Sequence, residues 1–114
     1  MLFLGKKKNK PTAFYIYSQS EDYKGFKRIK LSSYGHKPAE DGIRALSNKD
    51  LSGENIKVSI YEGEHPRAVI SVGKYEVGTI WKDSFDKFNA LKSGKISKMR
   101  LEIRDGDSYL FYLV

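Results

Sequence analysis

Residues 54–95 constrain the fold of this chain most, because three patterns of regular structure follow one another there. In the first, ENIKVSIYE, the apolar residues Ile56, Val58 and Ile60 alternate with Lys57 and Ser59. Successive side chains of a strand point to opposite faces of a sheet. The alternation therefore predicts a strand with one buried and one solvated face.

A hairpin is expected next, from AVISV and YEVGTI with Gly73-Lys74 between them. Glycine at the first position of a two-residue loop suits a type II′ turn, because glycine tolerates a positive φ. That turn would set Val72 opposite Tyr75. One face of the hairpin is then expected to carry Ala68, Ile70, Val72, Tyr75, Val77 and Thr79.

The third pattern, WKDSFDKFNALKSGK, predicts the main helix of the domain at residues 83–93. Asp83 suits the N-cap, with Asp86 as a capping-box-like partner three residues later. Gly94 suits the position at which a helix stops. The stripe expected to lie on the sheet consists of Phe85, Phe88 and Leu91.

A second hairpin is predicted at the C-terminus, in ISKMRLEIRDGDSYLFYLV. Asp105-Gly106 is a strong signal for a type I′ turn. The inner face is then expected to hold Met99, Leu101, Ile103, Leu110, Tyr112 and Val114. The turn also pairs Arg104 with Asp107 and, on the outer face, Lys98 with Leu113, Arg100 with Phe111 and Glu102 with Tyr109.

The N-terminal half predicts two more strands, within AFYIYS and GFKRIKLSSYG. In the second, Arg28 and Lys30 share one face, while Lys27 shares the other with Ile29. Residues 36–53 have little periodicity, and Gly42 weakens any helix there. We expect only one or two short helical turns inside a long surface connection.

These patterns together predict one mostly β (α+β) domain, a small antiparallel barrel-like structure of about six or seven strands with one main helix near 83–93. A chain of 114 residues is the size of a single domain. We expect residues 1–12, which include four lysines followed by Pro11, to form a flexible basic arm, and residues 13–114 to form the domain.

The formal net charge of +7 is unevenly distributed along the sequence. Residues 1–37 carry +7 and residues 82–104 carry +4, whereas 38–81 and the last ten residues each carry −2. If the two basic segments adjoin in space, they form one surface that attracts phosphates. A lysine-rich solubilising surface is the equally weighted alternative.

Catalysis, cofactors and metals are not expected. The chain has no cysteine, its two histidines are far apart, and it has neither GxxxxGK[ST] nor GxGxxG. No stretch is long and apolar enough for a signal peptide or a membrane span, so we expect a soluble cytoplasmic protein.

The central residues resemble the HIRAN domain, a small module related to OB folds. The resemblance covers roughly residues 28–104 and rests on LSGENIKVSIYE, on Val69-Ile70-Ser71-Val72 and on Val77-Gly78-Thr79-Ile80. It implies a module that binds single-stranded DNA, with a helicase or nuclease as a partner protein. Two features depart from the family pattern: the loop at residues 62–67 lacks an Asn–Asp pair, and Thr79 replaces an aromatic residue.

Single-strand binding needs basic groups for the phosphates and aromatic platforms for the bases. Family position points to His65 and Arg67. Strand alternation and charge point to the remaining candidates, which are Lys27, Arg28, Lys30, Tyr34, Lys98, Arg100 and Phe111. The sequence does not distinguish DNA from RNA as the ligand, or binding at the end of a strand from binding within it.

Each candidate also has a plain structural interpretation. For Arg100 and Phe111, a guanidinium–ring contact across two strands is favoured about two to one over contact with DNA. Trp81 is expected in the core at the helix entry, and His65 is expected to be an ordinary loop residue. The alternative function is a protein–protein interaction module, using the acidic hairpin around Glu62 and Glu76 or an exposed edge strand, without nucleic-acid binding.

Overall fold

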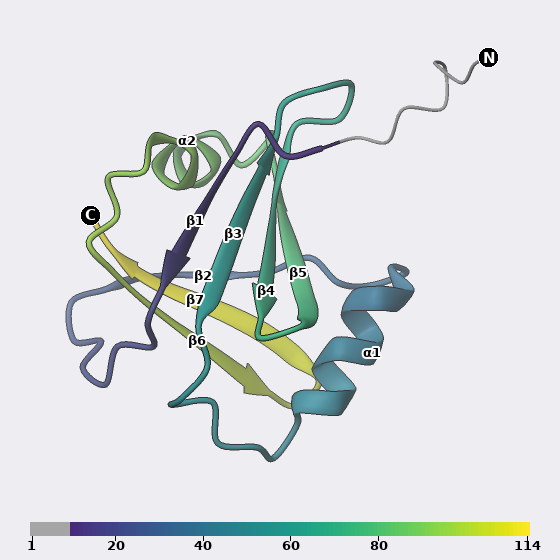
Figure 1. The fold of residues 1–114 in the computed structure, drawn as a ribbon, viewed down its shortest axis with the longest axis vertical. Helices are drawn as coiled ribbons and strands as arrows, with labels where there is room; N and C mark the ends of the chain where they lie inside the picture. Colours follow the sequence, from purple (N-terminus) through teal and green to yellow (C-terminus); the bar gives the residue numbers. More distant parts are fainter. Residues whose placement is uncertain (1–9) are drawn as a thin grey trace.

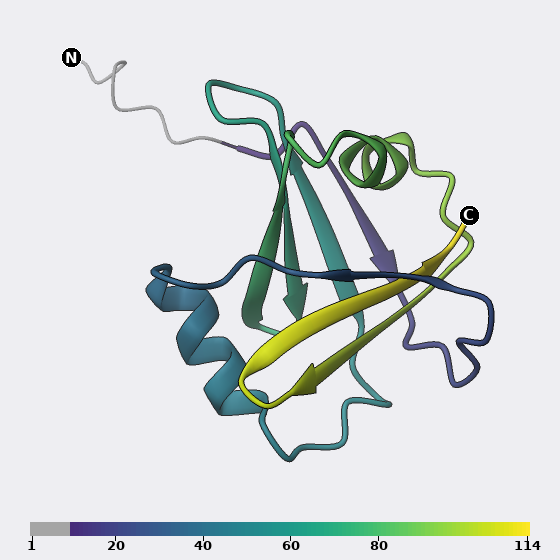
Figure 2. The same cartoon turned by 180° about the vertical axis from the view of Figure 1, so that it is seen from behind.

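The computed structural model describes residues 10–114, which form two packed antiparallel sheets with two helices against them (Figures 1 and 2). Sheet A has the strand order β1-β3-β4-β5, and sheet B has the order β2-β7-β6. The strands are β1 (Ala13–Tyr17), β2 (Lys27–Lys30), β3 (Ile56–Tyr61), β4 (Arg67–Val72), β5 (Tyr75–Trp81), β6 (Lys98–Arg104) and β7 (Asp107–Leu113). The helices are α1 (Lys37–Leu46) and α2 (Phe85–Ser93).

The core lies between the inner faces of the two sheets. As the alternation predicted, Ile56, Val58 and Ile60 are fully buried. Sheet B contributes Ile29, Met99, Leu101, Leu110 and Tyr112 to the same core. Burial of each large aliphatic side chain contributes about 1.5–3 kcal/mol, so this inner layer fixes which strand residues face outward.

The two sheets are not closed into a barrel. One isolated bridge joins Gln19 to Met99 at one seam, and a second joins Ser32 to Thr79 at the other. Within residues 10–114 the seven strands confirm the predicted mostly β domain. The basic arm expected at residues 1–12 lies largely outside the described residues.

The β4–β5 hairpin begins at the predicted turn, with Val72 opposite Tyr75 and Gly73 at a φ of 58°. Its predicted register is wrong beyond the first pairs. A bulge shifts the register between Ile70 and Ser71, so Ala68 pairs with Ile80 and Thr79 moves to the outer face opposite Val69. An extra residue in one strand changes which side chains share a face.

Helix α1 is a correction to the expected surface connection at residues 36–53. It spans ten residues and packs along β5, with Ala39, Ile43 and Leu46 buried. Gly42 permits that packing, because a Cβ there would lie 1.9 Å from the carbonyl oxygen of Glu76. Gly42 lowers the intrinsic helix propensity of this segment, but helix α1 requires it in order to approach the sheet closely.

The N-cap of helix α2 lies one residue later than predicted. Ser84 rather than Asp83 is its N-cap, and its side chain makes no capping hydrogen bond. Gly94 ends the helix in the left-handed conformation, as predicted, and Phe88 and Leu91 are buried. The side chain of Phe85 lies outside the described part of the chain.

The C-terminal hairpin follows the predicted register, including Arg104 opposite Asp107. Asp105 and Gly106 both have positive φ, as a type I′ turn requires. Val114 is a correction, because it is exposed rather than part of the inner face. Among the described residues, neither helix is long and apolar enough to cross a membrane.

Candidate nucleic-acid interface

The outer face of sheet B places basic and aromatic side chains side by side. Arg28 on β2, Phe111 on β7 and Arg100 on β6 form one row across its three strands. The neighbouring row is Lys30, Tyr109 and Glu102. The whole face carries five cations, Arg28, Lys30, Lys98, Arg100 and Arg104, and two carboxylates, Glu102 and Asp107.

Guanidinium groups lie over aromatic rings on this face. The guanidinium carbon of Arg28 is 5.5 Å from the ring centre of Tyr109, and that of Arg100 is 4.7 Å from the ring centre of Tyr23. Such contacts are cation–π interactions, each contributing about 0.5–1 kcal/mol at an exposed site. They hold the arginine side chains flat along the surface.

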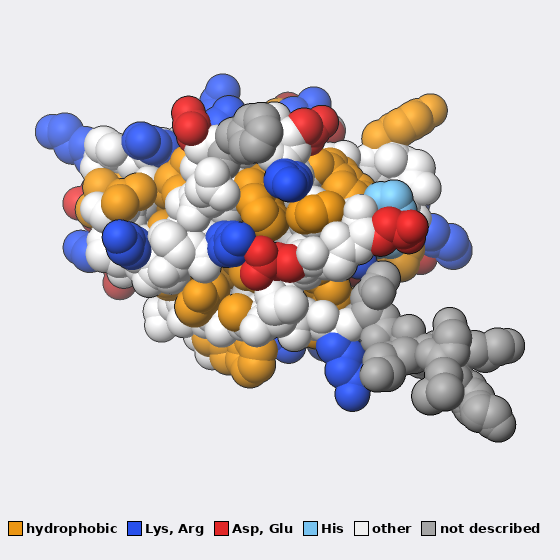
Figure 3. All heavy atoms as spheres, turned by 90° about the horizontal axis from the view of Figure 1, so that it is seen from above, with side chains coloured by type: hydrophobic (Ala, Val, Ile, Leu, Met, Phe, Trp, Pro, Cys, Tyr) orange, Lys and Arg blue, Asp and Glu red, His pale blue; other side chains and the backbone are white. Residues whose placement is uncertain are grey.

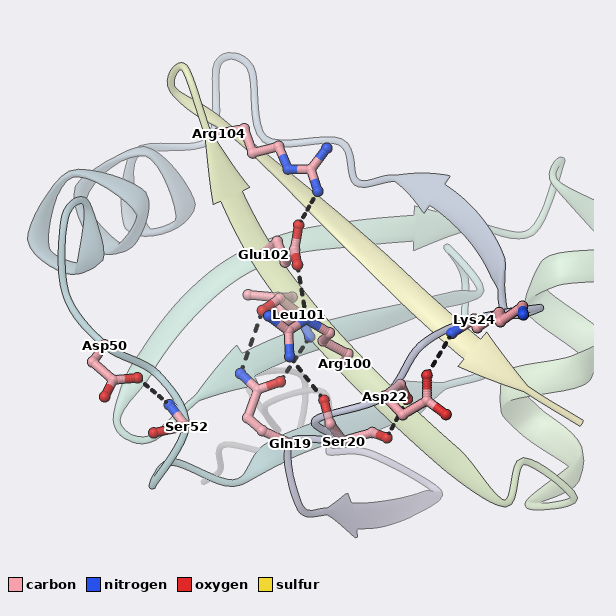
Figure 4. Close-up of polar contacts among 10 residues, drawn as sticks. All are labelled: Gln19, Ser20, Asp22, Lys24, Asp50, Ser52, Arg100, Leu101, Glu102 and Arg104. Carbon is pink, nitrogen blue, oxygen red and sulfur yellow. Dashed lines mark hydrogen bonds and ion pairs between the residues drawn. The ribbon is translucent and has the colours of Figure 1, made fainter.

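Glu102 holds two arginines of this face, Arg100 and Arg104, in place (Figure 4). Its carboxylate accepts hydrogen bonds from Arg104 and from Nε of Arg100, the latter at 2.7 Å. Burial alone would raise the pKa of Glu102, but the hydrogen bonds from Arg100 and Arg104 outweigh burial and hold that pKa below its ordinary value. Arg100 also donates to the carbonyl oxygen of Ser20 at 2.9 Å.

The cations of the face therefore differ in what they can offer a ligand. Arg100 and Arg104 are engaged with Glu102, and Lys30 lies 3.4 Å from a carboxylate oxygen of Asp107. Arg28 and Lys98 are exposed and form no ion pair with any described carboxylate. A phosphate could bind these two without first displacing a carboxylate.

Phe111 cannot serve as an open stacking platform in this structure. Only 7% of it is exposed, because the ring of Tyr23 packs against it edge-on at 4.9 Å and Arg104 lies over it at 5.8 Å. The rings that reach solvent on this face are those of Tyr23 and Tyr109, both partly exposed. The aromatic rings that a base could reach on this face are therefore those of Tyr23 and Tyr109, and not that of Phe111.

The candidates from family position lie on a different surface. Arg67 is on the outer face of sheet A, with its guanidinium carbon 4.3 Å from the ring centre of Tyr61 and 6.0 Å from that of Trp81. A pocket of about 240 Å³ is lined by these three side chains with His36 and Glu76. The pair His36 Nε2 and Glu76 Oε2, 2.6 Å apart, forms one wall.

Trp81 is 43% exposed, so its predicted place in the core is wrong. It lies opposite Arg67 in the β4–β5 ladder and therefore shares the outer face. His65 is an exposed loop residue, as expected, with its Nε2 3.7 Å from Glu64.

Two further candidates are separated from the outer face of sheet B. Lys27 is exposed but lies opposite Tyr112, on the other side of β2 from Arg28. Tyr34 is almost fully exposed in the segment before α1. The structure thus brings together Arg28, Lys30, Lys98 and Arg100 around Phe111, and leaves Lys27, Tyr34, His65 and Arg67 apart from them.

Seen from the side of α2 and the β3–β4 loop, basic side chains are scattered over the middle and the rim of the face among acidic and apolar ones (Figure 3). They form no single basic patch on that face. The outer face of sheet B differs in that it combines five cations with three aromatic rings, Tyr23, Tyr109 and Phe111.

Three residues of this face were not singled out from the sequence. The predicted hairpin register already sets Tyr109 opposite Glu102 on the outer face and Arg104 opposite Asp107, but neither Tyr109 nor Arg104 was among the predicted site residues. Tyr23 lies in the loop before β2, and no local pattern in the sequence places a loop residue against a distant strand.

No group of three or more His, Asp or Glu side chains that could hold a metal ion occurs in residues 10–114. Comparison with protein-family models, with curated proteins and with solved structures finds nothing that matches this chain.

Proposed function

We propose that this chain is a nucleic-acid-binding module that holds a single strand on the outer face of sheet B. One observation carries the proposal: three arginines lie over three aromatic rings on one side of a three-stranded sheet. Cationic groups beside aromatic faces are what a flexible single strand needs, because its phosphates and its bases must be bound together.

Arg28 and Lys98 are the primary phosphate contacts in this proposal, since neither must give up a carboxylate partner. Lys30 is a third contact, at the cost of its exposed pairing with Asp107. An exposed ion pair contributes at most about 1 kcal/mol, so a phosphate can replace Asp107 at little cost.

Tyr109 and Tyr23 supply the stacking surface. Stacking of a base on an aromatic side chain contributes about 1–3 kcal/mol per base and tolerates any sequence. Arg100, Arg104 and Glu102 act differently. Both arginines donate hydrogen bonds to Glu102, and Arg100 lies over the ring of Tyr23, so these contacts hold Tyr23 and the strand surface in place. The expected mode is therefore electrostatic and stacking contact with little reading of base identity.

The proposal predicts a defined salt dependence. Each phosphate contact on a single strand contributes about 0.7 to the slope of log K against log salt concentration. Three contacts give a slope of about −2, which is a loss of roughly twentyfold in affinity between 50 and 200 mM salt.

Fluorescence anisotropy of a labelled single-stranded oligonucleotide tests this with Arg28→Ala and a matched control, Arg44→Ala. Both arginines are exposed, but Arg44 lies on α1 beside Asp41. We expect Arg28→Ala to weaken binding and to reduce the salt slope by about 0.7, and Arg44→Ala to change neither.

Equal effects of the two substitutions would mean that binding depends only on overall charge. No binding to single-stranded DNA or RNA at low salt would refute the proposal and favour the protein-interaction alternative.

A further inference from the structure

The two sheets have four edge strands, β1 and β5 in sheet A and β2 and β6 in sheet B. Three of these edge strands are protected against pairing with another chain. Helix α1 packs along β5, so close that Gly42 approaches the carbonyl oxygen of Glu76. Strand β2 is short, and three of its four residues are charged. Short length, charge and a covering element are features that prevent an edge strand from pairing with a strand of another molecule.

Strand β6 is covered by a polar side chain (Figure 4). The amide of Gln19 accepts a hydrogen bond from the backbone N–H of Leu101 at 2.9 Å and donates one to its carbonyl oxygen at 3.4 Å. The next residue, Ser20, donates its backbone N–H to the carbonyl oxygen of Met99. Gln19 thus occupies the place of a peptide unit in a neighbouring strand.

In the described part of the chain, β1 has neither charged residues nor a covering element. Over residues 10–114 it pairs with β3 alone, at one border of sheet A, and it is joined to β6 only beyond its end, at Gln19 (Figure 1). Its sequence AFYIY contains no charge, proline or glycine. Its outward side chains, Phe14 and Ile16, are 55% and 58% exposed.

We propose that β1 is a self-association site, at which a second copy of this chain adds its own β1 antiparallel to the first. The pattern of the strand matches itself under a two-fold axis. An axis at Tyr15 sets Phe14 opposite Ile16 of the second copy, and the reverse contact follows by symmetry. Aromatic and β-branched residues opposite one another are favourable cross-strand pairs.

Charge also permits a second copy, despite the net charge of +7. Among the described residues, Lys57 on β3 lies opposite Ile16, and its Nζ is 4.9 Å from the ring centre of Phe14. In the paired arrangement the two Lys57 residues are three strand spacings apart, about 14 Å. That distance exceeds the Debye length of about 8 Å at physiological salt, so their repulsion is largely screened.

Sedimentation equilibrium of the full chain over a range of protein concentrations tests the proposal. The wild-type mass should rise above the 13.1 kDa of one chain as concentration increases. The double substitution Phe14→Lys with Ile16→Lys sets lysine opposite lysine twice in the dimer, and should raise the dimer Kd by about tenfold or more.

The matched control is Tyr34→Lys with Val114→Lys, which also replaces two exposed apolar side chains by lysine. It should associate as the wild type does, and circular dichroism should show that both double variants are folded. Amide exchange supplies a second readout, since residues 13–17 should become more protected as concentration rises.

A constant mass of one chain across the range would overturn the proposal, whatever the result of the nucleic-acid titration. Association that survives Phe14→Lys with Ile16→Lys would also overturn it, because pairing would then use another surface.

Discussion

Replacing Gly42 by alanine should destabilise the protein, although alanine is the better helix former. In a helix interior, alanine is favoured over glycine by about 1 kcal/mol. At this position the new Cβ would lie 1.9 Å from the carbonyl oxygen of Glu76, where 3.4–4 Å is ordinary contact. Helix α1 or strand β5 must therefore move by about 1.5 Å. The contact is with a backbone atom, so rotation of a side chain cannot relieve it.

The magnitude follows from these opposing effects. Overpacking of a dense interior costs up to about 3 kcal/mol, from which the gain in helix propensity removes about 1 kcal/mol. The net loss is about 2 kcal/mol, or a fall of roughly 8 °C in Tm for a domain of this size. Urea denaturation followed by circular dichroism measures the free energy of unfolding directly.

Gly53→Ala is the control, because a Cβ there meets nothing within 4 Å and the φ of Gly53 is not positive. It should leave the free energy of unfolding within about 1 kcal/mol of wild type. A Gly42→Ala protein as stable as wild type, or more stable, would refute the close packing of α1 on β5.

Three further substitutions test other contacts. Glu102→Gln should flatten the loss of stability on acidification. The folded pKa of Glu102 lies below its ordinary value, so the contribution of Glu102 to stability is present above the ordinary pKa and is lost as pH falls through the folded pKa. Urea midpoints compared at pH 7 and pH 3 would show this, and parallel losses in the two proteins would contradict it. Ser108→Ala should lower the free energy of unfolding by about 1–2 kcal/mol, because its buried hydroxyl donates to the carbonyl oxygen of Val77 at 2.6 Å; an unchanged urea midpoint would show that the hydrogen bond adds no net stability. Gln19→Ala should speed amide exchange at Leu101, whose N–H donates to the Gln19 side chain, while exchange at the neighbouring buried Leu110 stays slow; equal exchange rates at Leu101 in the two proteins would exclude Gln19 as its cover.

The sequence identifies the strands well because the core demands strict alternation. Ile56, Val58 and Ile60 on β3, and Met99 and Leu101 on β6, are buried as their period of two predicts. Asp105-Gly106 fixes the register of the C-terminal hairpin, because few residues accept the positive φ values of its turn.

The errors occur where long-range contacts override local preference. Helix α1 forms despite Gly42 because it packs on β5, where only a residue without a Cβ can approach the backbone of Glu76 so closely. The bulge after Ile70 turns Thr79 outward. Gly78 lies at this shift, and a glycine inside a strand often marks a bulge, but it does not by itself give the new register. Trp81 follows the outer alternation of β5, whereas its position at the helix entry suggested the core.

The candidate interface was predictable in part for the same reason. Alternation places Arg28, Lys30, Lys98 and Arg100 on one face once the strands of sheet B are known. It cannot show that Tyr23 arrives from a loop to cover Phe111, or that Glu102 engages two of the arginines. Those features depend on how the chain returns to the sheet.

The most direct test of the proposed interface is a ¹H–¹⁵N NMR titration of the full chain with a single-stranded oligonucleotide at low salt. The account predicts that the largest shift changes fall on Arg28 and Lys30 of β2, on Lys98 of β6, on Tyr109 of β7 and on Tyr23. Changes confined to the outer face of sheet A around Arg67 and Trp81, or no changes at all, would contradict it.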